Sequence, residues 1–118
     1  MRKRLDVTLL ARTLASGAAL VLAGFGPAAL AADTAAAEAL ARKSGCLKCH
    51  STTRDKDGPA YAKIAAKYKG QADAQQKLVA FLSTPSKIKV DGKDDTHKAL
   101  DSKSEADVRN VVDWILTR

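Results

Sequence analysis

The feature that most constrains this chain is a pair of cysteines three positions apart, Cys46 and Cys49, followed at once by His50. A chain of 118 residues has room for one small domain, and a domain of that size buries too little surface to gain much from its own core. The sequence holds no other cysteine. A disulfide between these two would close so small a loop that it would stabilise the fold little. The stabilisation must therefore come from another source, such as a metal or a cofactor.

The segment Cys46-Leu47-Lys48-Cys49-His50 has the spacing of a c-type haem attachment site. Two thiols separated by two residues can reach the two vinyl groups of a porphyrin and form thioether bonds, and the adjacent imidazole can then ligate the iron. We therefore expect one covalently bound haem c, with His50 as an iron ligand. Two alternatives are weaker. A thioredoxin-like redox pair requires a βαβ context that the sequence lacks, and a zinc site requires a second pair of ligands.

The first 31 residues have the layout of a secretory signal peptide. Residues 2–4 are basic, residues 14–22 form an apolar run, and small residues at 29–31 suit cleavage by a signal peptidase. We predict a signal peptide over 1–31 and a mature domain over 32–118 that works in the periplasm. A retained membrane anchor is the alternative, but the apolar run is short beside the roughly 20 residues that a span needs.

The charge of the chain bears on its partners. The net charge of the full sequence is +7 at pH 7, although the predicted signal peptide carries several of the basic residues. No dense stripe of arginines is present, so we expect no nucleic-acid partner. A moderately basic domain is attracted to acidic protein surfaces. We expect redox proteins as partners, and no integral membrane segment once the signal peptide is cleaved.

The mature chain has the pattern of a helical domain. Asp33 is a good N-cap for a helix over 35–44, and a second helix is expected over 60–69, where the apolar residues recur with helical spacing. A third helix is expected over 72–83. Ser104, with an acidic residue three positions later, predicts the start of the last helix.

A long polar segment, 86–103, separates the third helix from the last one. We expect it to be a loop, and no segment of the chain shows the extended alternation of apolar and polar residues that predicts a sheet. The predicted fold class is therefore all-α, with three to five helices around one haem.

Several segments resemble the small bacterial class I cytochromes c. The resemblance lies in residues 43–50, 57–61, 65–70 and 112–116, and covers most of 41–70 and 104–116. It implies the cytochrome c fold, with the first and last helices crossing. It also implies that the carbonyl of Pro59 accepts a hydrogen bond from His50, which would fix the imidazole ring and raise its basicity.

The sequence departs from that family at the second iron ligand. The family normally supplies a methionine from the loop before the last helix, whereas the single methionine here is Met1, inside the predicted signal peptide. His97, the only other histidine, lies close to the place of the missing methionine. We expect His50 and His97 to ligate the iron together, which would give a lower reduction potential than a Met/His pair. Lys93, Lys98 and an open sixth position are the alternatives.

The expected function is one-electron transfer, not enzymatic catalysis, because no acid/base or nucleophilic group accompanies the haem motif. Two alternatives remain: a ligand-binding or sensing protein with an open iron site, and a cytochrome subunit dedicated to one periplasmic oxidoreductase. Candidate residues for the wall of the haem pocket are Tyr61, Ile64, Leu78, Phe81, Leu82, Leu100, Val111 and Trp114. Candidate lysines for partner docking are Lys48, Lys63, Lys67, Lys87, Lys89 and Lys98.

Overall fold

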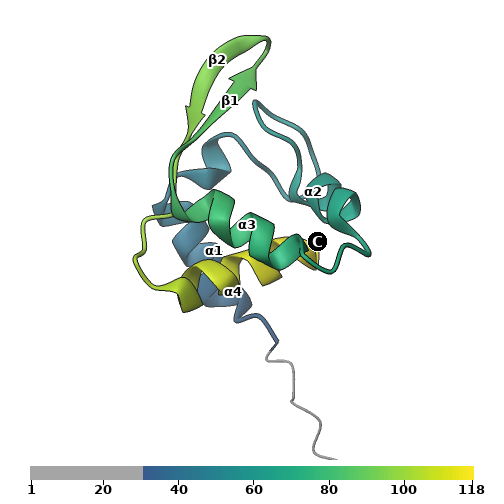
Figure 1. Cartoon of the computed structure of the whole chain (residues 1–118), viewed down its shortest axis with the longest axis vertical. Coiled ribbons are helices and arrows are strands. Elements are labelled where there is room, and N and C mark those ends of the chain that lie inside the picture. The colour runs from purple at the N-terminus through teal and green to yellow at the C-terminus, as the bar shows by residue number, and fades with distance from the viewer. Residues whose placement is uncertain (1–30) are drawn as a thin grey trace, which may run out of the picture.

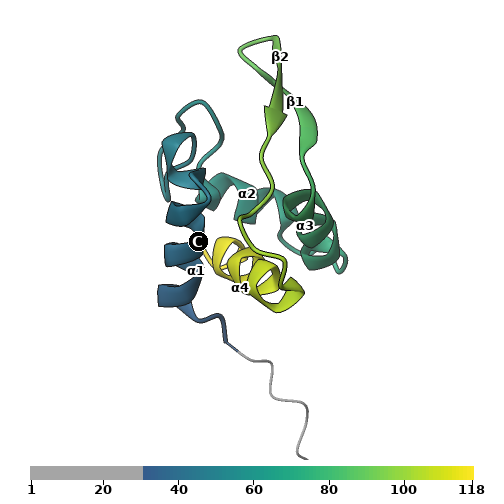
Figure 2. The same ribbon diagram turned by 90° about the vertical axis from the view of Figure 1, so that its left-hand side faces the viewer.

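The computed structural model describes residues 31–118 (Figures 1 and 2). The elements are α1 (Thr34–Lys43), a 3-10 turn (Cys46–Lys48), α2 (Tyr61–Tyr68), α3 (Ala74–Ser83), β1 (Ser86–Val90), β2 (Lys93–His97) and α4 (Glu105–Leu116). The predicted signal peptide, apart from residue 31, lies outside the described residues. Among the helices described, none has the length and apolar character needed to cross a membrane.

The helix ends follow from local sequence signals. Asp33 caps α1, where its side chain accepts a hydrogen bond from the backbone N–H of Ala36 at 3.0 Å, and Ser104 caps α4 through the N–H of Asp107 at 3.3 Å. Such caps satisfy backbone donors that the first turn of a helix leaves unpaired. Gly45 follows α1 with a φ of +77°, a left-handed conformation that glycine adopts at helix ends without steric cost. The four expected helices are confirmed, within a residue or two at each end.

Helix α4 is the centre of the core, because α1, α2 and α3 all pack against it. The buried cluster consists of Ala37, Ala41, Tyr61, Leu78, Leu82, Leu100, Val108, Val111, Val112, Trp114 and Ile115. The small side chains of Ala37 and Ala41 are fully buried on α1 and let it approach α4 closely. Two hydrogen bonds join the same helices: Asp33 N donates to Asn110 Oδ1 at 2.7 Å, and Asn110 Nδ2 donates to the Asp33 carbonyl at 3.0 Å.

The expectation of a sheet-free chain is wrong, because part of the polar segment 86–103 forms an antiparallel hairpin. Ser86 pairs with His97 at its base and Val90 pairs with Lys93 at its tip. Asp91 and Gly92 make the turn with φ values of +49° and +76°, and positive φ at both central positions matches the twist of a two-residue hairpin. The hairpin projects from the helical body (Figures 1 and 2). The fold is otherwise helical, as predicted.

Candidate functional site

The two cysteines and His50 lie on one tight turn. After Gly45, the N–H of Lys48 donates to the Gly45 carbonyl at 3.2 Å, and the Cys46 carbonyl accepts from the N–H groups of Cys49 at 3.2 Å and of His50 at 2.9 Å. Both thiols are free, with Cys46 half-buried and Cys49 exposed. Burial raises the pKa of the Cys46 thiol, which favours its neutral form.

The His50 ring is held on both sides. Its Nδ1 donates a hydrogen bond to the carbonyl oxygen of Pro59 at 2.6 Å. Its plane stacks on Tyr61, with the ring centroids 5.3 Å apart and 17° between the planes. Because a carbonyl oxygen can only accept, the proton lies on Nδ1, and Nε2 is left with the lone pair that a metal ligand needs.

Gly58 packs directly against the same ring. A Cβ atom at this position would lie 2.6 Å from Cε1 and 3.0 Å from Nδ1 of His50, closer than any side chain tolerates. This contact of Gly58 is not predicted from the sequence. The signal was present, because glycine is the residue that permits close approach to another group, but its partner becomes evident only in three dimensions.

Backbone hydrogen bonds hold the loop between the turn and α2. Gly58 N donates to the Cys49 carbonyl at 2.8 Å, and Tyr61 N donates to the Ser51 carbonyl at 2.9 Å. Asp55 completes the loop, because its Oδ1 accepts from the N–H of Ala60 at 2.9 Å. These contacts fold the chain back so that Pro59 faces His50.

His97, the last residue of β2, lies close to His50. The two ring centroids are 6.0 Å apart, and the planes are inclined by 55°. Two imidazoles that share one metal ion would have a centroid separation of this order, since each bond from imidazole nitrogen to a metal is about 2 Å long. Phe81 packs against the His97 ring at 4.7 Å between centroids. The structure thus brings together the two histidines that the sequence singled out.

The side chain of His97 is half-buried, and its Nδ1 is a buried atom with no hydrogen-bond partner among the described residues. Desolvation lowers the pKa of His97, and the nearby His50 lowers it further. Both effects favour the neutral imidazole, which is the form that binds metals. An unsatisfied buried nitrogen is costly unless something else binds it.

The backbone around His97 is fixed at three points. Ser86 pairs with it across the hairpin. Three residues further on, Leu100 N donates to the Leu82 carbonyl at 2.8 Å, and then Asp101 N donates to Oγ of the buried Ser44 at 2.9 Å. Ser44 directly precedes the haem-motif turn, so the segments carrying the two histidines are joined by a hydrogen bond.

The candidate wall residues fall into two groups. Tyr61, Leu78, Leu82, Leu100, Val111 and Trp114 are buried in the core, whereas Ile64 is partly buried and Phe81 is 36 % exposed. Trp114 meets Tyr61 edge-on, with the ring centroids 5.2 Å apart. Of the alternative ligands, Lys93 lies at the tip of the hairpin, opposite Val90, and Lys98 is exposed beside His97.

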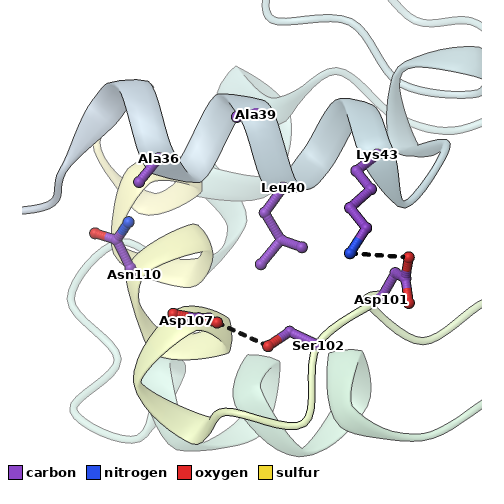
Figure 3. A pocket seen from close by; sticks show the side chains of 8 residues that line it. All are labelled: Ala36, Ala39, Leu40, Lys43, Asp101, Ser102, Asp107 and Asn110. Carbon is purple, nitrogen blue, oxygen red and sulfur yellow. Dashed lines mark hydrogen bonds and ion pairs between the residues drawn. The ribbon is translucent and has the colours of Figure 1, made fainter.

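A separate hollow of about 380 Å³ lies between α1 and the start of α4, and Leu40 points into it (Figure 3). Lys43 Nζ and Asp101 Oδ2 form an ion pair at 3.3 Å on one side of the hollow. Neither histidine nor cysteine lines it. Its contacts tie α1 to the segment that leads from His97 to α4.

Three observations on these residues fit a haem group. The two thiols are free on a turn that ends at His50. The position of Gly58 leaves space for the His50 ring, whose Nδ1 is engaged while Nε2 is left for a metal. The nearby His97 has a buried nitrogen, Nδ1, with no hydrogen-bond partner among residues 31–118. Thiols, imidazoles and apolar walls are the donor set and surroundings that a covalently bound haem takes.

Comparison with known proteins gives a consistent result. A family model described as cytochrome c matches residues 34–118. Cytochrome c2 of Rubrivivax gelatinosus is 41% identical over 78 residues, which is 65% of this chain and 91% of that protein. Cytochrome c-552 of Hydrogenobacter thermophilus is 35% identical over 91 residues, covering 75% of this chain and 87% of that protein.

Solved structures agree with the sequence matches. The class 1 cytochrome MtoD of Sideroxydans lithotrophicus ES-1 superposes with a TM-score of 0.70 at 45% identity, covering 74% of this chain and 97% of that one. Wild-type cytochrome c552 of Nitrosomonas europaea gives a TM-score of 0.56 at 32% identity, covering 68% and 96%. The chain therefore belongs to the cytochrome c family, and it is a monohaem c-type cytochrome that carries electrons on a haem attached through Cys46 and Cys49.

Proposed function

We propose that this cytochrome is an exported, periplasmic one-electron carrier whose iron is ligated by His50 on one side and His97 on the other. Haem c, when bound, supplies an iron that exchanges one electron between its ferric and ferrous states. The observation that supports the ligand pair is the proximity of the two rings, whose centroids are 6.0 Å apart. The only methionine in the sequence is Met1, so the ligand usual in this family has no source in residues 34–118.

Each side chain then has a distinct task. Cys46 and Cys49 attach the cofactor, so that a small exported protein does not lose it. Pro59 orients His50 and makes its imidazole a stronger donor. His97 is held by the hairpin and by the Leu100 and Asp101 backbone bonds. A second imidazole donates more strongly to ferric iron than a thioether does, so the proposed pair favours the oxidised state.

Partner docking is proposed to use exposed lysines near the two histidines. All six candidate lysines are exposed. Within residues 31–118, Lys63 is paired with Asp55 and Lys89 with Asp94, so their charges are partly neutralised. Lys48 lies within the haem motif and Lys98 directly follows His97 in the chain. Neither lysine forms an ion pair within the described part of the chain. An acidic redox partner would therefore be attracted to this end, with a reaction rate that falls as salt rises.

The test of the ligand pair is the spectrum of the haem-loaded protein beside that of His97→Ala. The wild type is expected to be low-spin in both oxidation states and slow to bind carbon monoxide. His97→Ala is expected to become high-spin and to bind carbon monoxide quickly. Lys98→Ala is the matched control, because it removes a neighbouring candidate ligand and should leave the spectrum unchanged.

Two results would contradict the proposal. A low-spin spectrum that survives in His97→Ala would exclude His97 as the ligand, and the near-infrared charge-transfer band would then distinguish lysine from other ligands. Rapid carbon monoxide binding by the wild type would indicate an open sixth position. Export is tested separately, by the mass of the periplasmic product, which should correspond to a chain beginning at residue 32.

A further inference from the structure

A single peptide group, the one that joins Pro59 to Ala60, is hydrogen-bonded at both ends. Its carbonyl oxygen accepts from Nδ1 of His50 at 2.6 Å. Its N–H donates to Oδ1 of Asp55 at 2.9 Å. The carboxylate of Asp55 and the imidazole of His50 are therefore joined through one amide, although their side chains do not touch.

Hydrogen bonds in such a series polarise one another. A carboxylate that accepts from the N–H draws the proton toward itself and increases the negative charge on the carbonyl oxygen of the same amide. That oxygen then accepts more strongly from Nδ1–H of His50, and the imidazole becomes a stronger electron donor at Nε2. Bonds to an ionised group are also roughly twice as strong as neutral ones.

The other oxygen of the carboxylate is engaged too. Asp55 Oδ2 pairs with Nζ of Lys63, which lies in the first turn of α2. Hydrogen bonding from Lys63, followed by that from the Ala60 N–H, lowers the pKa of Asp55, so the carboxyl is ionised at neutral pH. The lysine also draws charge away from the amide, and so opposes the effect of Asp55 on the peptide.

We propose that Asp55 is a positioning residue that tunes the reduction potential of the haem by acting on His50 through the Pro59–Ala60 peptide group, with Lys63 moderating its effect. The inference rests on the proposed role of His50 as an iron ligand. Asp55 lowers the potential, because a more basic imidazole stabilises ferric iron.

The test compares Asp55→Asn with Asp57→Asn in the haem-loaded protein. Asparagine at 55 keeps an oxygen that can accept from the Ala60 N–H but removes the charge. Asp57 lies in the same loop, is exposed, and makes no hydrogen bond or ion pair with the described residues. Asp57→Asn therefore removes the same charge as Asp55→Asn without removing a contact. Asp55→Asn is expected to favour reduction on the order of threefold, or about 28 mV since tenfold is 59 mV for one electron. Asp57→Asn should shift the potential less.

The Nδ1 proton of His50 gives a second measurement. Its NMR resonance is expected to move in Asp55→Asn, toward the position of a weaker hydrogen bond, and to stay in place in Asp57→Asn. Equal potential shifts in the two variants, with an unmoved Nδ1 resonance in both, would overturn the inference. If the wild type lacks a hyperfine-shifted His50 ring altogether, His50 is not a ligand and the proposed function fails instead.

Lys63→Met provides an independent check. Lys63→Met removes the positive charge that opposes the effect of Asp55 on the peptide group. The reduction potential should therefore fall when Asp55 is present. If the effect passes through Asp55, Lys63→Met should have little effect in the Asp55→Asn background, because contributions through a shared group are not additive. An additive shift in the double variant would show that Lys63 acts through space alone and would contradict the proposal.

Discussion

A Cβ atom added at Gly58 would lie 2.6 Å from Cε1 of His50. Gly58→Ala must therefore displace either the ring or the loop, and overpacking of this kind costs about 1–3 kcal/mol. We expect a lower midpoint in denaturant unfolding of the haem-loaded protein and a weakened hydrogen bond from Nδ1 to Pro59. A variant with wild-type stability and an unchanged Nδ1 proton resonance would show that the loop absorbs the methyl group without moving the ring.

His97→Met would replace the proposed His/His pair with the Met/His pair usual in this family. A thioether stabilises ferric iron less than an imidazole does, so the reduction potential should rise. We expect a rise well beyond 59 mV, which is a tenfold change for a one-electron couple. Spectroelectrochemical titration measures it. A potential that stays within a few millivolts of the wild type would mean that residue 97 does not ligate the iron.

The turn of the hairpin can be tested through Gly92, whose φ is +76°. Alanine in this left-handed conformation costs about 1–2 kcal/mol, so Gly92→Ala should loosen the hairpin and let His97, the proposed ligand, dissociate from the iron more often. Faster binding of added imidazole or carbon monoxide would show this. Gly70→Ala is the control, because Gly70 has a φ of +78° with open space around it and lies between α2 and α3. Equal acceleration in both variants would contradict the prediction.

Acid should weaken the fold partly through Asp73. A hydrogen bond from Lys77 lowers the pKa of this carboxyl below its ordinary value of 3.8. A carboxyl whose pKa is lower in the folded state stabilises the fold above its unfolded pKa, and this contribution is lost as the pH falls through the folded pKa. Asp73→Asn should therefore be less stable than the wild type at pH 6, and the difference should shrink as the pH falls below 3.8 and vanish below the lower pKa of the folded state. Urea unfolding at several pH values measures it, and a constant difference would exclude the ion pair as the cause.

The helices could be predicted because their signals are local. Asp33 and Ser104 cap the helices that follow them. Gly45 lies between the end of α1 and the 3-10 turn and has a left-handed φ. Each of these residues acts on backbone groups within a few positions, so the sequence alone contains the relevant neighbours. The haem motif is local in the same sense, since its spacing sets the chemistry.

The hairpin and the role of Gly58 depend on contacts that the sequence does not display. Residues 86–90 alternate apolar and polar side chains over too few positions to indicate a strand, and the dipeptide Asp91-Gly92 is typical of a turn but does not show which strands it joins. Lysine and aspartate dominate β2, and such residues are depleted in strands. Gly58 reaches His50 only because its own N–H bonds the Cys49 carbonyl and bends the loop back.

The pair Ser86–His97 lies at the base of the hairpin, four residues along each strand from the pair Val90–Lys93 at its tip. Residues added to or removed from both strands at the tip change the length of the projection, while the pair at the base keeps its register. Evolution can therefore vary the charge and reach of the tip, and with them the surfaces this cytochrome meets, while His97 keeps its place opposite His50.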